Sequence, residues 1–302
     1  MSNEVLQARI RELKKDKNAL IIAHNYQPRE IQDIADFCGD SFELCLKASE
    51  SDAEVLIFCG VHFMAETANL LCPEKKVILP ELSAGCTMAD MVEEQGLLKM
   101  KERHPGAAAV CYINSPAAVK ARCKVCCTSA NALKVIESLE EDEIIFVPDK
   151  NLANYIARRT EKKIIPWEGY CQAHDSVTPE DVARAREAHP EALLIVHPES
   201  RAEVIELADF AGGTGDMLKF VGESDAREFI VGTEMGMLYP LEKRYPEKVF
   251  HPLSEKMFCP DMKKISLEAV LKALENSEPE VIVPKEIAEK ALQAVQRMME
   301  IR

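Results

Sequence analysis

The residues best suited to chemistry in this chain stand in three columns of an internal repeat. When residues 18–51 are written above residues 106–139 and 191–224 without gaps, apolar residues fall under apolar residues. Each column takes one polar side chain from every copy: His24, Tyr112 and His197; Tyr26, Asn114 and Glu199; Ser41, Ser129 and Thr214. Such imidazole, phenol, amide, carboxylate and hydroxyl groups bind polar ligands and transfer protons. The columns therefore predict one polar site shared by three related units.

The hydroxyl column also has the signature of helix N-termini. Ser41, Ser129 and Thr214 each precede a helical pattern, and a hydroxyl at such a position commonly caps the first amides. Because helix starts attract anions, three converging starts predict an anion subsite, with the closest backbone access at Gly212–Gly215. The chain lacks both the P-loop pattern and the GxGxxG pattern, which argues against a P-loop nucleoside triphosphatase and a dinucleotide-binding protein.

Three of the eleven cysteines are distinguished by the same repeat. Cys86, Cys171 and Cys259 each follow the last strand of a copy, at equivalent positions. Three converging thiolates favour an iron–sulfur cluster or zinc, and the residues alone leave both open. The Cys123–Cys126 pair has metal-like spacing, but its columns otherwise hold mostly alanine, which indicates packing. The same interpretation applies to Cys38, Cys45, Cys59, Cys72, Cys111 and Cys127.

The elements that position these residues alternate between strands and helices, which predicts an α/β fold with mainly parallel sheets. We expect a helix through Ile31, Ile34 and Phe37, and terminal helices over 266–276 and 284–301. The boundaries predicted for the three repeat domains and the terminal helices are 1–88, 89–174, 175–262 and 263–302. The expected strands are 19–23, 55–59, 77–79, 108–112, 144–147, 163–166, 193–197, 229–231 and 249–251.

The composition narrows the partners and the compartment. Acidic residues outnumber basic ones by 51 to 37, a net charge of −14, which argues against nucleic acid or an anionic membrane as partner. Neither a secretion signal nor an apolar run of membrane-spanning length is expected from the pattern. Many cysteines without an export signal favour a reducing compartment, so we expect a cytoplasmic protein.

Several spaced phrases resemble the quinolinate synthase family, the A protein of bacterial NAD biosynthesis. The resemblance covers nearly the whole chain and implies three homologous α/β/α-sandwich domains around a pseudo-threefold axis. It also implies a [4Fe–4S] cluster held by one cysteine per domain. The implied reaction condenses iminoaspartate with dihydroxyacetone phosphate to give quinolinate, phosphate and two waters. The phrases are 23–26, 39–41, 60–66, 85–86, 112–115, 127–131, 197–199, 232–234 and 259–260.

The resemblance assigns expected roles residue by residue. Cys86, Cys171 and Cys259 match the cluster ligands, and the nine column residues match the family's active-site set. An open iron would act as Lewis acid, with Glu199 and Tyr26 as general base and acid and His24 and His197 assisting. Asn114, Ser41, Ser129 and Thr214 would hold carboxylates and phosphate, and Tyr112 would position substrate. Domain closure is expected to use segments 87–92 and 172–178 as hinges.

Two departures and three alternatives accompany this assignment. Gly213 stands where many members have serine, and Met262 and Ile265 replace the extra cysteines of one subgroup. The alternatives are a zinc- or iron–sulfur-dependent hydro-lyase acting on another small dicarboxylate, a zinc hydrolase, and a non-catalytic sensor of dicarboxylates or phosphates. The partner that the resemblance implies is an iminoaspartate-producing enzyme in transient contact.

Overall fold

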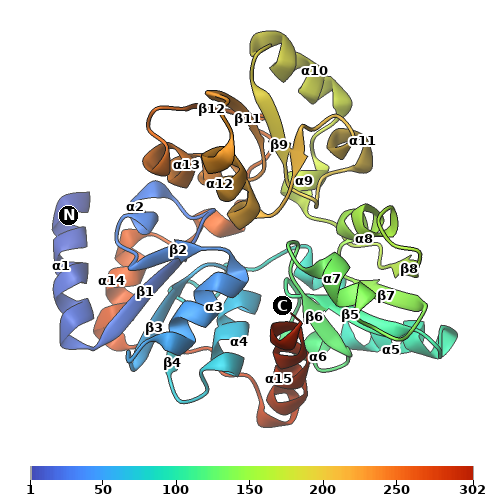
Figure 1. Ribbon diagram of the computed structural model, residues 1–302. Coiled ribbons are helices and arrows are strands. Elements are labelled where there is room, and N and C mark those ends of the chain that lie inside the picture. The colour runs from blue at the N-terminus through green and yellow to red at the C-terminus, as the bar shows by residue number, and fades with distance from the viewer. Residues whose placement is uncertain (1, 302) are drawn as a thin grey trace.

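The computed structural model describes residues 2–301 and contains three four-stranded, all-parallel sheets arranged around a common centre (Figure 1). The strand orders are β2-β1-β3-β4, β6-β5-β7-β8 and β10-β9-β11-β12, so the three sheets share one topology. In each sheet the second strand pairs with one side of the first strand, and the third strand pairs with the other side of the first. A ligand site is expected outside the carboxyl ends of the strands at such a reversal.

The first unit follows helix α1 and is built from buried apolar strands. Its central strand, β1, has four successive buried residues, as a strand covered on both faces requires. The elements are α1 (Asn3–Asp16), β1 (Ala19–His24), α2 (Arg29–Gln32), β2 (Phe37–Gly39), α3 (Ser41–Glu50), β3 (Val55–Cys59), α4 (His62–Leu71) and β4 (Lys76–Ile78), followed by the 3₁₀ helix η1 (Ala89–Met91).

The second and third units repeat this plan. The second contains α5 (Glu94–Arg103), β5 (Ala108–Tyr112), α6 (Ala117–Lys120), β6 (Val125–Cys127), α7 (Ala132–Glu137), β7 (Glu143–Val147), α8 (Lys150–Ala157), β8 (Lys163–Pro166) and α9 (Gln172–Asp175). The third contains α10 (Pro179–Ala188), β9 (Leu193–Val196), α11 (Ala202–Ile205), β10 (Phe210–Ala211), α12 (Thr214–Glu223), β11 (Glu228–Gly232), η2 (Met235–Met237), α13 (Leu238–Arg244), β12 (Val249–Pro252) and η3 (Asp261–Lys263). All nine predicted strands are present, each within one residue of its expected ends.

The predicted helix through Ile31, Ile34 and Phe37 is wrong. The helix α2 ends at Gln32, and Phe37 begins the edge strand β2, which the sequence pattern missed together with β6 and β10. These strands are two or three residues long, too short to show an alternating pattern. The Asp36 side chain extends the pairing by accepting the amide of Ile21 at 2.9 Å, and Asp209 does the same for Leu194 at 2.7 Å.

The two terminal helices lie where the sequence predicts them, as α14 (Leu267–Asn276) and α15 (Lys285–Glu300). The buried face of α14 joins an apolar core that runs through the first unit into the third. The buried face of α15, with Ala294, Val295 and Met298, completes the core of the second unit. The domain boundaries expected from the sequence stay a prediction. In the described part of the chain, no helix has the length and apolar character needed to span a membrane.

Candidate active site

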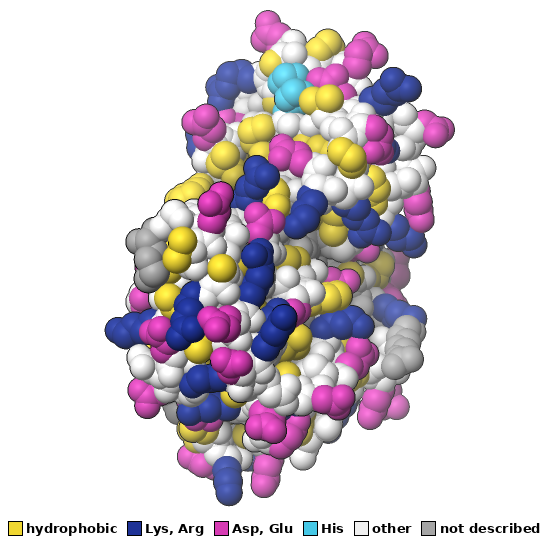
Figure 2. Space-filling view, turned by 90° about the vertical axis from the view of Figure 1, so that its left-hand side faces the viewer, with side chains coloured by type: hydrophobic (Ala, Val, Ile, Leu, Met, Phe, Trp, Pro, Cys, Tyr) yellow, Lys and Arg dark blue, Asp and Glu magenta, His cyan; other side chains and the backbone are white. Residues whose placement is uncertain are grey.

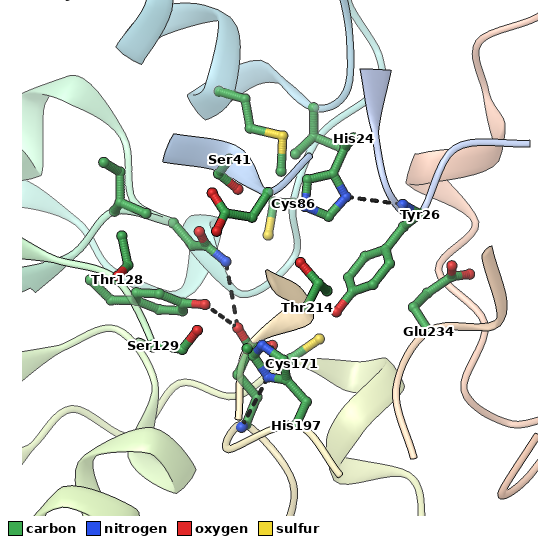
Figure 3. Close-up of a pocket in the computed structure, with 18 of the residues that line it drawn as sticks. His24, Tyr26, Ser41, Cys86, Thr128, Ser129, Cys171, His197, Thr214 and Glu234 are labelled. Carbon is green, nitrogen blue, oxygen red and sulfur yellow. Dashed lines mark hydrogen bonds and ion pairs between the residues drawn. The ribbon is translucent and has the colours of Figure 1, made fainter. Parts of the chain in front are cut away.

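One cavity of about 350 Å³ lies between the three units, at the carboxyl ends of their strands (Figure 3). It is lined by all twelve residues that the sequence singles out: His24, Tyr26, Ser41, Cys86, Tyr112, Asn114, Ser129, Cys171, His197, Glu199, Thr214 and Cys259. The first column reaches the cavity because β1 ends at His24, β5 ends at Tyr112 and His197 follows β9. The structure therefore brings together groups that are far apart in the chain.

His24 and His197 occupy matching positions and have matching environments. The Nδ1 atom of His24 accepts the amide of Tyr26 at 3.1 Å, and that of His197 accepts the amide of Glu199 at 3.2 Å. Burial lowers the pKa of His24 to about 3, with help from the nearby Lys263 charge, and burial lowers the pKa of His197 to about 4. Both rings are thus neutral near pH 7 and carry their proton on Nε2. They are suited to donate hydrogen bonds rather than to act as imidazolium acids.

Glu199 is buried at the centre of a hydrogen-bond network. Its Oε1 accepts from the Tyr112 hydroxyl at 2.7 Å, and its Oε2 lies 2.9 Å from Nδ1 of His174. The Asn114 amide lies 3.5 Å from Oε1. Burial by itself would raise the pKa of Glu199, but His197, His174 and these hydrogen bonds hold the pKa well below its usual range. Glu199 is therefore an ionised carboxylate and, in this arrangement, a weak isolated base.

The columns missed His174, which lines the cavity, and Thr233, which is hydrogen-bonded to it. His174 Nε2 lies 2.8 Å from the Thr233 hydroxyl, which in turn lies 2.6 Å from the Tyr26 hydroxyl. A continuous chain of hydrogen bonds therefore runs from Tyr26 through Thr233 and His174 to Glu199. Burial, reinforced by the Glu199 charge, raises the pKa of Tyr26, so its phenol stays protonated. The Cys-x-x-His spacing from Cys171 was the sequence signal that could have identified His174.

The capping role predicted for the hydroxyl column is wrong. The N-cap of α3 is Asp40, whose carboxylate accepts the amides of Phe42 and Glu43, and the N-cap of α12 is Gly213. Ser41 and Thr214 are the first residues of those helices, and Ser129 lies in the turn before α7. Because neighbouring residues are the N-caps, these hydroxyls do not cap the start of the helices. The N-termini of α3 and α12 still border the cavity, as an anion subsite requires.

Gly213 brings the second and third units close together at this end of the cavity. A Cβ atom added at Gly213 would lie 2.8 Å from the Ser129 hydroxyl oxygen. Real Cβ atoms do not approach oxygen so closely, so a serine at this position would displace the Ser129 side chain.

A half-buried carboxyl beside this subsite predicts a measurable effect of pH on stability. Burial, reinforced by the Glu43 charge, raises the pKa of Asp40 to about 6. Between about pH 4 and 6 the folded protein holds a proton that the unfolded chain has released, so stability falls as the pH rises through this window. We expect Asp40→Asn, which preserves a good N-cap, to be more stable than the parent by about 1–2 kcal/mol at pH 7.5.

Thermal unfolding measured from pH 4.5 to 7.5 tests this expectation. The advantage of Asp40→Asn should shrink as the pH falls towards 4.5. Ser266→Asn is the matched control, because Ser266 caps α14 with a side chain that does not titrate. Its difference from the parent should not change over this range, and a pH-independent difference for Asp40→Asn would contradict the argument.

The three cavity cysteines are built into equivalent local structures. A short helical turn begins within three residues after each cysteine: η1 after Cys86, α9 after Cys171 and η3 after Cys259. Burial raises the pKa of all three thiols, that of Cys86 to about 12. In every case the backbone N–H three residues later, at Ala89, His174 or Met262, lowers the thiol pKa and partly offsets burial. Amides aimed at sulfur are suited to stabilising metal-bound thiolates.

Glu234 fixes the loop that carries Cys259. Its buried carboxylate accepts the amide of Cys259 at 3.1 Å and lies 2.9 Å from the Lys263 ammonium. Lys263 also donates to the carbonyl of Tyr26, so the loop is tied to the first unit. Glu234 follows β11 where Asp149 follows β7, and both cap the next helix. An acidic residue two positions after β7 and after β11 was the signal that could have revealed Glu234.

The other eight cysteines do not line the cavity. Six of them are buried, as the packing interpretation predicts, and Cys38 and Cys123 are half-buried. The local Cys123–Cys126 motif therefore lies outside the site, with Cys126 in β6.

The fold and the cavity together describe a protein of three α/β/α units that share one candidate metal-binding site. The particular family follows from comparison with known proteins: the family model for quinolinate synthetase A protein matches residues 8–300, and the chain belongs to this family. Proteins named quinolinate synthase from Dehalococcoides mccartyi strain CBDB1 and Caldicellulosiruptor saccharolyticus are each 52% identical to it, over the full length of both chains. One from Methanosarcina barkeri is 51% identical, covering 100% of this chain and 99% of its own.

Proposed function

We propose that this chain condenses iminoaspartate with dihydroxyacetone phosphate to give quinolinate, phosphate and two waters. The observation that carries the proposal is the single cavity to which each unit contributes one thiol and three polar column residues. Family membership and full-length relatives named quinolinate synthase support the same reaction. We place the activity in the cytoplasm, with an iminoaspartate-producing enzyme as transient partner.

The donor set fits a [4Fe–4S] cluster held by Cys86, Cys171 and Cys259. Zinc–sulfur bonds of about 2.3 Å would bring three sulfurs around one ion to within about 4 Å of one another. Within residues 2–301, these three cysteines do not form a group whose ligand atoms all lie within 4.8 Å. Such spacing favours a larger, multinuclear group. When bound, the cluster would supply an iron without a protein ligand, which acts as a Lewis acid on a substrate oxygen or nitrogen.

The polar residues supply binding and orientation. His24 and His197, neutral and protonated on Nε2, donate hydrogen bonds to substrate oxygens. Ser41, Ser129 and Thr214, with the N-termini of α3 and α12, hold the phosphate or a carboxylate of the substrates. Tyr112 and Asn114 orient the substrate and Glu199 together. These roles match the chemistry of two anionic substrates that react in one cavity.

Proton transfer is assigned to the hydrogen-bonded chain and not to one isolated base. Enolisation and dehydration both need groups that accept and return protons. Glu199 alone is a weak base because its pKa is lowered, but its contact with His174 lets the pair share a proton. Tyr26 and Thr233 extend this pair across the cavity to the first unit. We propose that Glu199 and His174 take the proton and that Tyr26 returns one.

The direct test is an anaerobic assay with iminoaspartate generated in situ and dihydroxyacetone phosphate. We expect quinolinate and phosphate in equal amounts, and neither when one substrate is omitted. Iron should be measured in the same preparation, with about four atoms per chain expected for a [4Fe–4S] cluster. A preparation with full iron content that gives no quinolinate would overturn the proposal.

A second candidate function is favoured by one tight ligand group. Cys171, His174 and Glu199 offer sulfur, nitrogen and oxygen atoms within 4.8 Å of one another, which suits a single zinc ion. A zinc-dependent hydro-lyase acting on another small dicarboxylate would use this group. Metal analysis of protein purified under argon separates the two functions, because this candidate requires stoichiometric zinc and no iron.

A further inference from the structure

A second group of metal-binding side chains lies outside the cavity, on the third unit. His189 is the C-cap of α10, Glu228 begins β11 and His251 lies in β12. None of the three lines the cavity. Figure 2 shows histidine side chains exposed on this part of the molecule, with acidic side chains beside them. All three residues are half-buried, so the group is open to solvent but held by its surroundings.

The three side chains converge on one oxygen atom. Nδ1 of His189 lies 3.2 Å from Oε1 of Glu228, and Nε2 of His251 lies 2.8 Å from the same oxygen. The two imidazole rings are stacked, with centroids 3.4 Å apart and planes inclined by 14°. All three ligand atoms lie within 4.8 Å of one another. By contrast, the surface pair His104 and Glu143 has one histidine and a separation of 4.0 Å.

The backbone holds two of these ligands on the same face of the sheet. In the parallel pairing of β11 with β12, Glu228 is opposite Val249 and Ile230 is opposite His251. Glu228 and Ile230 are two residues apart, so Glu228 and His251 project from one face. His189 reaches that face from the end of α10. The arrangement thus depends on three separate elements that the fold fixes in place.

We propose that His189, Glu228 and His251 form a second metal site, selective for zinc or a similar borderline divalent cation. Two imidazole nitrogens and one carboxylate oxygen are ligands that zinc, nickel and copper accept, whereas magnesium and calcium prefer oxygen alone. A cation held by Nδ1 of His189, Nε2 of His251 and Oε1 of Glu228 would replace the direct contacts that these atoms now make. Water completes the coordination, because the site is exposed. The bound metal ties the end of α10 to the edge of the third sheet.

Cluster-loaded protein, kept anaerobic, should be dialysed against micromolar zinc and analysed for iron and zinc together. Loading the cavity first prevents zinc from occupying the thiols. We expect one zinc per chain in addition to the iron, and a higher Tm in the presence of zinc. Glu228→Gln, which preserves shape, and His251→Ala should each weaken zinc binding by at least about 100-fold, since even neighbours of ligands cost 10- to 100-fold.

His104→Ala is the matched control, because it removes a histidine from a histidine–carboxylate pair that lacks a third ligand. It should bind zinc like the parent. Quinolinate formation should be unchanged in Glu228→Gln, which separates this site from the proposed reaction. The proposal would be overturned if the parent bound no zinc. It would also be overturned if the parent and Glu228→Gln bound zinc equally well.

Discussion

Replacing Cys86, Cys171 or Cys259 with serine is expected to remove the bound iron and reduce quinolinate formation by at least about 1,000-fold. Each thiol lies in the cavity at an equivalent turn, so no neighbouring cysteine can replace it. A three-ligand cluster that loses one thiolate loses a third of its protein bonds, and cluster binding depends on those bonds. Iron content and the visible absorbance of anaerobically purified protein measure the effect directly.

Cys126→Ser is the matched control for these variants. Cys126 is buried in β6 and does not line the cavity, so the substitution should lower stability without changing iron content. A variant that lacks all three cavity cysteines but still holds a full cluster would refute the assignment. If folded Cys126→Ser lost its iron, the cluster would have to be assigned to the second sheet instead of the cavity.

Glu199→Gln is expected to lower kcat by about 100- to 10,000-fold while the cluster stays intact. Glutamine keeps the shape of the side chain and can still accept from Tyr112. It removes the negative charge that faces His174 and His197, and with it the capacity of the Glu199–His174 pair to hold a proton. Steady-state kinetics with iron content as reference would show the change in kcat rather than in binding.

Glu206→Gln provides the comparison for Glu199. Glu206 is exposed, forms an ion pair with Arg158 and does not line the cavity. Its kcat should equal that of the parent. Near-normal turnover by Glu199→Gln at full iron content would remove Glu199 from the proton-transfer chain. His174→Gln should then be tested, since it breaks the same chain one step further on.

The internal repeat predicted much of the site because most site residues lie at or just after the ends of strands. Residues such as His24 and His197 follow buried strands of clear apolar pattern, and those strands were predicted to within one residue. The edge strand that begins at Phe37 escaped detection because it is short and is held partly by the Asp36 side chain. Here a tertiary contact decided the conformation, and no local pattern records it.

The residues that sequence reasoning missed act through contacts between units. His174 lies in the short helix α9, and Thr233 and Glu234 follow β11. Only the fold places these residues against Glu199, Tyr26 and Cys259. The capping error at Ser41 has a different cause: Asp40, one residue earlier, is an equally good cap. The hinges at 87–92 and 172–178 and the domain closure that would use them stay predictions.

The position of α15 has a consequence for how the site can be assembled in time. This helix is synthesised after all three units, yet Val295 and Met298 belong to the core of the second, and Ala291 packs with Leu70 and Ala117 between the first and second. Until α15 is made, the second unit has an uncovered apolar face. We therefore expect the three cavity cysteines to be held together stably, and iron to be inserted, only after α15 has been synthesised.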